Sequence, residues 1–452
     1  MAILLRNLKG RFENALSNPT IIIVFSFLIV ILIGACLLTL PFASENQEST
    51  PFLDSLFTAT SATCVTGLIV VDTADHWSLF GELVIISLIQ IGGLGFITLA
   101  TFFLSSFRRK TGLKSMMLAQ ESIGGFNIQD ALPMVHQIVK MVFLIEFTGA
   151  VLLAIAFVPQ FGLKGIYYGI FHAISAFCNA GFDLMGGFKS MVEFNNHPLV
   201  LYTIDALIVV GGLGFIVWRD LLNWRKNGRL MIHTRMVLII TAFLLIGGSL
   251  FVYLAEYSNA LGQLPDHEKI NAAIFMSVNS RTAGYTSIDN ASMLSVTKTF
   301  ISILMFIGGA SGSTAGGIKV NTLGIMIIAI ISVIKSNNET VVGKKRIPNN
   351  VVLKAFSVTM LAAALVSIVT MSINLMQPEF SLIDTLFEAT SGFATVGLSS
   401  GVSPLLNAPG KLLIIISMFV GRVGPISFAL TFSLFKKENS GVVYPDGKFI
   451  VG

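Results

Sequence analysis

Four segments of this sequence end in a glycine after a similar run of residues. They read SLFTATSATCVTGL (55–68), GIFHAISAFCNAGF (169–182), AIFMSVNSRTAGYT (273–286) and TLFEATSGFATVGL (385–398). Aligned without gaps, they bring four glycines to one position: Gly67, Gly181, Gly284 and Gly397. Glycine adopts positive φ at little steric cost, so it lets successive carbonyls turn the same way. Four such segments facing one another would supply rings of carbonyl oxygens that replace the hydration shell of a monovalent cation.

The elements that must position these segments follow from the composition. Of 452 residues, 54% are apolar and only 12% are charged, and the mean hydropathy is +0.81, which is typical of a membrane protein. A helix needs about 20 predominantly apolar residues to cross a bilayer. Eight stretches qualify, at approximately 19–41, 79–106, 133–158, 199–224, 231–257, 297–334, 350–376 and 409–436.

The run before each glycine is helical in character but, at about 12 residues, too short to cross a bilayer. Non-helical backbone at membrane depth survives only where protein buries it or where it lines a watery cavity. The sequence therefore predicts an all-α integral membrane fold of four span–pore helix–span repeats. This arrangement comprises eight transmembrane helices and four re-entrant pore helices around one pseudo-fourfold pore. The predicted repeats, within a single membrane domain 1–452, are approximately 19–106, 133–224, 231–335 and 350–437, followed by a short tail, 438–452.

The distribution of positive charge predicts the orientation. Most of the 29 Lys and Arg residues lie in the N-terminal segment, in three alternate loops and in the C-terminal tail, and none lies between Pro41 and Leu79. Cytoplasmic loops of membrane proteins carry the excess of Lys and Arg. The N- and C-termini are therefore expected in the cytoplasm, and the acidic outer segments would attract cations.

The stretch 297–334 is too long for one straight crossing, because a helix rises about 1.5 Å per residue. It contains GGASGSTAGG, a run of small residues that loses backbone entropy in a helix and can line a pore as an unwound segment. The candidate gate comprises this run, the lysine after it and one arginine of the last span: Gly308, Gly309, Ala310, Ser311, Gly312, Ser313, Thr314, Ala315, Gly316, Gly317, Lys319 and Arg422. A tight helix-packing stripe is the alternative for the small-residue run.

Charged groups inside the apolar segments are expensive unless they face a cavity or a partner. Arg422, within GRVGP, is expected either to form an electrostatic barrier below the glycine segments or to join a buried salt bridge. Arg281 is expected to point away from the pore and to pair with an acid such as Asp289 or with a carbonyl. For Glu146 and Asp205 we favour hydrogen bonding between helices over ion binding.

A second glycine element follows each segment, as GGLGF (92–96), GGLGF (211–215), GGASG (308–312) and GRVGP (421–425). Close packing of helices is the simplest interpretation of the first two copies.

Together, the four glycine segments, the run GGASGSTAGGIK and the C-terminal YPDGKFIVG resemble the Trk/Ktr/HKT superfamily of potassium transport proteins, most closely its bacterial Ktr ion-translocating membrane subunits. The resemblance covers essentially the whole chain. It implies gated, channel-like potassium uptake across the bacterial plasma membrane, with K⁺ bound by backbone carbonyls of a selectivity filter. Carried over to this sequence, the filter is Thr63, Cys64, Val65, Thr66, Gly67, Phe177, Cys178, Asn179, Ala180, Gly181, Ser280, Arg281, Thr282, Ala283, Gly284, Phe393, Ala394, Thr395, Val396 and Gly397.

The resemblance also implies a homodimer with one pore in each subunit, seated on a ring of a cytosolic nucleotide-binding regulatory subunit. In this superfamily a serine in place of the first glycine accompanies sodium preference, so Gly67 agrees with potassium. Cys64 and Cys178 share one position and are expected to be small buried residues. The four segments differ in sequence, so the filter is only pseudo-symmetric.

Other functions are less well supported by the sequence. A sodium-coupled potassium symporter, or a weakly selective sodium/potassium transporter, stays open, although inverted repeats would favour such a transporter and these repeats are parallel. The six histidines and three cysteines are scattered, without metal-ligand spacing, and no G-x-S-x-G nucleophile motif occurs. We therefore expect no enzyme activity, no cofactor in this chain and no nucleic-acid partner, with membrane lipid as its surroundings.

Overall fold

The computed structural model describes residues 19–107, 117, 131–337, 339–343 and 345–425. The expected C-terminal tail, 438–452, and the end of the last repeat lie outside the described residues. So do the basic residues of the N-terminal segment and of the loop after residue 107.

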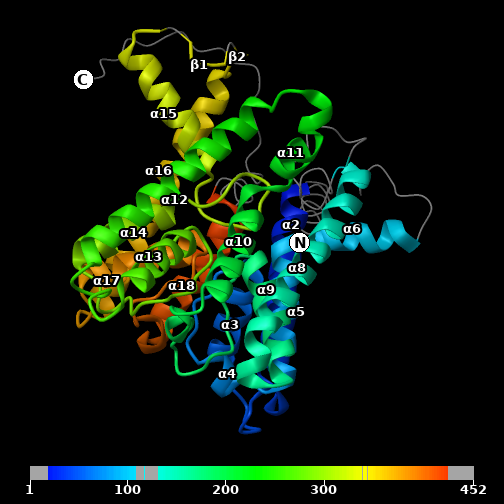
Figure 1. The fold of residues 1–452 in the computed structure, drawn as a ribbon, viewed down its shortest axis with the longest axis vertical. Coiled ribbons are helices and arrows are strands. Elements are labelled where there is room, and N and C mark those ends of the chain that lie inside the picture. Colours follow the sequence, from blue (N-terminus) through cyan, green and yellow to red (C-terminus); the bar gives the residue numbers. More distant parts are fainter. Residues whose placement is uncertain (1–18, 108–116, 118–130, 338, 344, 426–452) are drawn as a thin grey trace, which may run out of the picture.

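The described chain is helical and repeats one order of elements four times (Figure 1). Each group has a long first helix, a short helix that ends just before one of the four glycines, and a second helix. The first helices are α2 (Pro19–Leu38), α8 (Ala131–Phe161), α12 (Ile232–Glu256) and α16 (Asn349–Met376). The short helices are α3 (Phe52–Cys64), α9 (Lys164–Phe177), α13 (Asp266–Asn279) and α17 (Leu382–Ala394). The second helices begin as α5 (Leu79–Leu94), α10 (Pro198–Leu213), α14 (Ser295–Phe306) and α18 (Ala408–Val423).

The second helices are interrupted. The stretch 79–106 is divided at Gly95 into α5 and α6 (Phe96–Phe107), and 199–224 is divided at Gly214 into α10 and α11 (Phe215–Asn227), which bend by 93°. Both glycines have positive φ, 81° and 91°, a conformation that ends a regular helix. The sequence marked both stretches as membrane spans but gave no break within them. In contrast, the predicted break of 297–334 is confirmed, since α14 ends at Phe306 and α15 (Val320–Ile334) begins after a loop.

Minor elements complete the connections: α4 (Thr73–His76), the 3₁₀ turns Pro41–Ala43, Val192–Phe194 and Ser403–Leu405, and a hairpin of β1 (Val341–Val342) and β2 (Lys345–Arg346). The hairpin, α11 and α15 lie toward one end of the molecule and α4 lies at the other (Figure 1).

Contacts between groups close the four into a ring. Each second helix packs against the short helix of the next group: α5 against α9, α10 against α13, α14 against α17, and α18 against α3. The last of these contacts joins the end of the described chain to its beginning. The short helices are therefore the inner layer, and their large side chains, such as Phe57, Phe275 and Phe387, are fully buried.

The outer layer exposes apolar side chains. Phe147 on α8, Phe243 and Ile246 on α12, and Leu353 on α16 are 67% to 74% exposed, an arrangement that is unfavourable in water over a large area. Within the described part, these four first helices are long and apolar enough to cross a membrane, and the bent pair α10–α11 also qualifies when taken together. The surface is thus that of a protein with a lipid-facing exterior.

Candidate functional site

The four aligned glycines meet in a closed cycle. A methyl group added at Gly67 would collide with the carbonyl oxygen of Ala180, the residue before Gly181. The same holds from Gly181 to Ala283, from Gly284 to Val396, and from Gly397 back to Thr66. Each glycine therefore lies directly against the carbonyl that precedes the next glycine, and no side chain fits at any of the four positions.

The backbone of each segment alternates in handedness. The glycines have φ between 71° and 96°. The residues two positions earlier, Val65, Asn179, Thr282 and Thr395, also have positive φ, from 51° to 74°, whereas the residues between them do not. Alternation of left-handed and ordinary φ turns successive carbonyls toward the same side, which is what a carbonyl-lined cation path needs. Positive φ is strained for β-branched residues such as Val65, Thr282 and Thr395, and strain of this kind persists where the surroundings enforce it.

Buried polar groups hold the segments in place. The Ser61 hydroxyl accepts a hydrogen bond from the Gly67 N–H at 3.1 Å, and Ser391 does the same for Gly397 at 3.0 Å. In the third group, Asn279 Oδ1 accepts from the Tyr285 N–H at 3.2 Å. The first and fourth segments are thus built alike, and the third is held differently.

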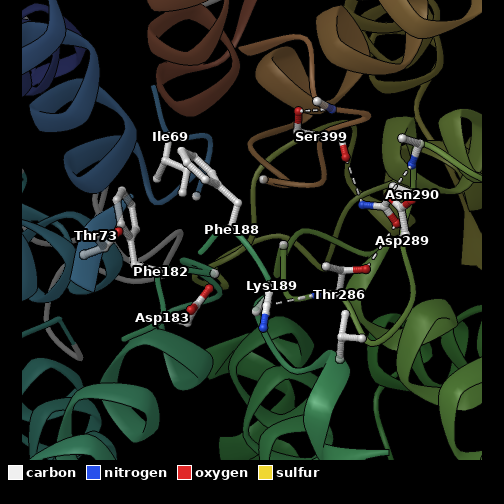
Figure 2. A pocket seen from close by; sticks show the side chains of 18 of the residues that line it. Ile69, Thr73, Phe182, Asp183, Phe188, Lys189, Thr286, Asp289, Asn290 and Ser399 are labelled. Atoms are coloured by element: carbon white, nitrogen blue, oxygen red, sulfur yellow. Dashed lines mark hydrogen bonds between the residues drawn. The ribbon is translucent and has the colours of Figure 1, made fainter. Parts of the chain in front are cut away.

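A hollow opens on one side of the four glycines. Its volume is about 620 Å³, and all four glycines line it. Asp183, Asp289, Asn290, Thr286 and Ser399 contribute polar groups to its wall (Figure 2). A cation arriving through the hollow would meet carboxylate and amide oxygens before it reached the glycine carbonyls.

The loop 308–317 lies on the opposite side of the segments and bonds directly to them. Thr314 Oγ1 donates to Asn179 Oδ1 at 2.8 Å and lies 3.3 Å from the Phe177 carbonyl oxygen. A methyl group at Gly316 would collide with the Thr395 hydroxyl. The loop therefore contacts both the second and the fourth segments.

The break at Gly214 provides hydrogen-bond partners for the loop 308–317. The Phe215 N–H, freed where α10 ends, donates to the Gly312 carbonyl at 2.9 Å. The Ala310 N–H donates to the Gly212 carbonyl at 2.9 Å. The bend in the second group thus supplies backbone partners that an unbroken helix would have used internally.

Arg422 and Lys319 both bind this loop through its backbone. The Arg422 guanidinium donates to the carbonyls of Thr314 and Gly92, and Lys319 Nζ donates to the Ala315 carbonyl at 2.6 Å. No described carboxylate forms an ion pair with Arg422, which argues against a salt bridge within the described part. Arg422 instead connects the loop to α5, and it remains partly exposed.

Arg281 is buried at 7% exposure and donates to the Gly308 carbonyl at 2.9 Å. Of the two partners expected, the carbonyl is the one found. Asp289 instead caps its own loop by accepting from the Ala291 N–H at 2.9 Å. Arg281 therefore ties the third segment to the start of the loop 308–317.

The second glycine elements turn out to adjoin the segments. A methyl group at Gly92, Gly211 or Gly421 would collide with the carbonyl oxygen of Thr63, Phe177 or Phe393, respectively. These carbonyls belong to the first residue of the first, second and fourth candidate filter segments, whereas Gly308 lies against the Gly316 carbonyl. Sequence reasoning found the glycines but missed their partner; the signal was their spacing of 24 to 30 residues after the first set.

The remaining predicted residues have structural partners. Glu146 accepts from Gln90 Nε2 at 3.2 Å, and Asp205 Oδ1 lies 3.5 Å from Asn279 Nδ2, so both connect neighbouring helices as expected. Cys64 and Cys178 are both fully buried. No group of three or more potential metal ligands occurs among the described residues.

A comparison with protein families decides which class of protein carries this ring. The family model described as TrkH, cation transport protein, matches residues 2–441. The chain belongs to the TrkH family. It is a cation transporter of the membrane and not an enzyme.

Full-length relatives agree with the TrkH assignment. The potassium/sodium uptake protein NtpJ of Enterococcus hirae is 40% identical, with 98% of this chain and 99% of the relative covered. The Ktr system potassium uptake protein B of Bacillus subtilis is also 40% identical, covering 96% and 97%. The crystal structure of the potassium transporter TrkH from Vibrio parahaemolyticus has the same fold, with a TM-score of 0.71 at 18% identity over 93% of this chain and 86% of that one.

Proposed function

We propose that this protein takes up potassium through a gated, channel-like pore lined by the four glycine segments. The observation that carries the proposal is the closed cycle in which each glycine lies against the carbonyl before the next one. The alternating φ within each segment favours carbonyls that turn toward the axis of this cycle. The filter comprises residues 63–67, 177–181, 280–284 and 393–397.

In the membrane, the four groups form eight spans and four re-entrant pore helices, with both termini in the cytoplasm. The repeated order of helices supports this arrangement, as does the placement of basic residues in alternate loops. The repeats occupy approximately 19–106, 133–224, 231–335 and 350–437. The hollow beyond the glycines then faces outward and receives the incoming ion.

The decisive experiment measures K⁺ and Na⁺ flux into proteoliposomes that hold the purified protein and its Gly67→Ser variant. A serine at Gly67 would meet the Ala180 carbonyl and require φ near 92°, so it would distort the ring. We expect robust K⁺ flux in the original protein and loss of the preference for K⁺ in the variant. Gly247→Ser is the matched control, because a Cβ at Gly247 meets no atom within 4 Å. Equal selectivity in all three proteins would contradict the filter assignment.

The loop 308–317, with Lys319 and Arg422, is the proposed gate. Its support is its position under the segments, the hydrogen bond from Thr314 to Asn179, the close packing of Gly316 against Thr395, and the hydrogen bonds by which Arg422 joins the Thr314 carbonyl to the Gly92 carbonyl. Shortening Gly309–Gly316 should raise the flux measured without any partner protein. An unchanged flux would count against this gate.

The proposed assembly is a homodimer, with one pore per subunit, on a ring of a cytosolic nucleotide-binding regulatory subunit. It rests on the superfamily resemblance and on the basic residues that face the cytoplasm in the proposed topology, including Arg225, Arg229 and Arg235 around the α11–α12 turn. Neutralising these three residues should weaken co-purification with such a ring and leave K⁺ flux of the isolated protein unchanged.

A second candidate function is sodium-coupled potassium transport or weakly selective sodium/potassium uptake. The differing sequences of the four segments favour it, as does the name of the Enterococcus relative, a potassium/sodium uptake protein. An inward Na⁺ gradient that drives K⁺ accumulation at zero membrane potential would support coupling. Uptake that follows membrane potential alone would support the channel-like pore.

A further inference from the structure

Four polar contacts join each helix group to the next, and we call them the inter-group clasps. Each connects the beginning of a second helix with the beginning of the short helix in the following group. The clasps are Lys411 Nζ to Asp54 Oδ1 at 2.6 Å, Tyr167 OH to Glu82 Oε2 at 2.7 Å, Tyr202 OH to Asn271 Oδ1 at 2.7 Å, and Lys298 Nζ to Asp384 Oδ1 at 2.8 Å.

The clasps occupy equivalent positions in the groups. Asp54, Asn271 and Asp384 stand at the same distance before their respective glycines in the alignment of the four segments, and Tyr167 is one residue further back. On the other side of the contact, Glu82, Lys298 and Lys411 all lie in the first turn of their helices. Tyr202 lies one residue further along α10. Four unlike residue pairs therefore fill one repeated structural position.

The two ion pairs among the clasps are shielded from solvent. The side chains of Lys298 and Asp384 are 9% and 27% exposed, and those of Lys411 and Asp54 are 16% and 18% exposed. In contrast, the Lys189–Glu193 pair, which lies within one group, is more than 60% exposed on both sides. Exposed pairs contribute little, whereas removal of one partner from a shielded pair leaves a poorly solvated charge.

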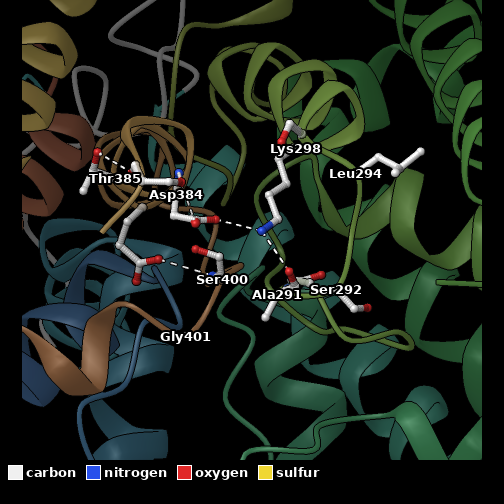
Figure 3. Close-up of polar contacts among 12 residues, drawn as sticks. Ala291, Ser292, Leu294, Lys298, Asp384, Thr385, Ser400 and Gly401 are labelled. Atoms are coloured by element: carbon white, nitrogen blue, oxygen red, sulfur yellow. Dashed lines mark hydrogen bonds and ion pairs between the residues drawn. The ribbon is translucent and has the colours of Figure 1, made fainter. Parts of the chain in front are cut away.

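Additional bonds orient the clasp between the third and fourth groups. Lys298 Nζ also donates to the Ala291 carbonyl at 2.9 Å (Figure 3). Asp384 accepts a second bond from the Ser381 hydroxyl at 2.7 Å. Both partners are therefore held in one geometry, and the clasp is a fixed point between α14 and α17.

Each clasp fixes one end of a short helix whose other end carries a glycine segment. A helix of about 13 residues is about 20 Å long and is stiff, so a tilt at its beginning moves the carbonyls at its end. Selection between cations depends on the size of the carbonyl cage or on the number and strength of its dipoles. Both quantities change when one of the four segments shifts.

We propose that the inter-group clasps are positioning residues that set the width of the carbonyl ring and thereby its preference for K⁺ over Na⁺. The inference rests on the proposed function, since it concerns the cation preference of the same pore. The fourth group depends most on charge, because both ion pairs hold it to its neighbours. The other two clasps each rely on a tyrosine hydroxyl.

The test is a charge exchange read out as the ratio of K⁺ to Na⁺ flux in proteoliposomes. Lys298→Asp and Asp384→Lys each place like charges together, so each should lower the ratio several-fold. The double variant restores an opposite pair and should recover most of the ratio. Asp266→Asn is the matched control: Asp266 starts α13, is 75% exposed and pairs 3.7 Å away with Lys269 of the same helix, so its ratio should stay that of the original protein.

A milder variant covers the case in which charge reversal prevents folding. Tyr202→Phe removes only the hydroxyl that contacts Asn271 and should lower the flux ratio while thermal stability stays close to that of the original protein. Unchanged ratios in folded single variants, or no recovery in the folded double variant, would overturn the inference. If the charge variants do not fold, an unaltered ratio of K⁺ to Na⁺ flux in Tyr202→Phe would overturn the inference. Absence of cation flux both in the unmodified protein and in a protein with Gly309–Gly316 shortened would instead refute the proposed function itself.

Discussion

Replacement of Thr314 by valine isolates one contact of the proposed gate. The change keeps the shape of the side chain and removes the hydroxyl that donates to Asn179 Oδ1 at 2.8 Å. A neutral hydrogen bond contributes about 0.5–1.5 kcal/mol net, and an acceptor left buried without its donor adds to the loss. The seated loop should therefore be destabilised by about 1–2 kcal/mol, because the released loop leaves Asn179 accessible to water.

This energy converts into a change in the population of open pores. Since about 1.4 kcal/mol corresponds to a tenfold change in an equilibrium, the open fraction should rise about 5- to 30-fold from a low starting value. The assay is initial K⁺ flux into proteoliposomes at equal protein content. The ratio of K⁺ to Na⁺ flux should stay unchanged, because the glycine segments keep their own bonds.

Thr297→Val is the control for a buried threonine that loses its hydroxyl. Thr297 lies on α14, is fully buried, and its hydroxyl has no hydrogen-bond partner among the described residues. Its flux should match that of the original protein. The reasoning is refuted by equal flux in Thr314→Val and Thr297→Val, or by a Thr314→Val flux that rises only together with a loss of selectivity.

Two further predictions concern the walls of the pore. Gly211→Ala should abolish flux and lower the melting temperature, because the added methyl group would collide with the Phe177 carbonyl. Gly212→Ala is the control and should be tolerated, because the nearest atom to its added methyl group is 3.7 Å away. A functional Gly211→Ala protein would contradict the packing argument. Partial burial, reinforced by the neighbouring Asp72 carboxylate, raises the pKa of Asp183 to about 6. Lowering the external pH from about 7.5 to about 5 therefore protonates Asp183 and removes a negative charge from the hollow. K⁺ uptake at low K⁺ concentration should fall through this range, and Asp183→Asn should flatten the pH profile; an identical profile in the variant would remove Asp183 as the cause.

The sequence predicted the features that depend on residue type along a single repeat. The four aligned glycines and the break before α15 could be recognised because glycine and other small residues mark unusual backbone locally. Whether a glycine interrupts a helix depends on which groups can form hydrogen bonds with the backbone N–H and C=O groups that the break leaves free. Gly95 and Gly214 were read as packing residues, since the partner of Phe215, the Gly312 carbonyl, is distant in the chain.

The contacts between groups could not be predicted for a similar reason. Lys298 and Asp384 are far apart in sequence and become neighbours only when the ring closes. Arg422 was recognised as an unusual charge in an apolar segment, but its acceptors are backbone carbonyls, which leave no mark in a sequence. Residue type singled out Arg422 but neither Lys298 nor Asp384, and only the tertiary structure identified the partners of all three.

The loop 308–317 belongs to one group of four, whereas the second helices of the first two groups are each interrupted at a single glycine, Gly95 or Gly214. If this loop closes the pore, opening requires one local rearrangement and no concerted, iris-like movement of four helices. Each pore would then switch between two conductance levels without intermediate steps, and its closed dwell times would follow a single exponential.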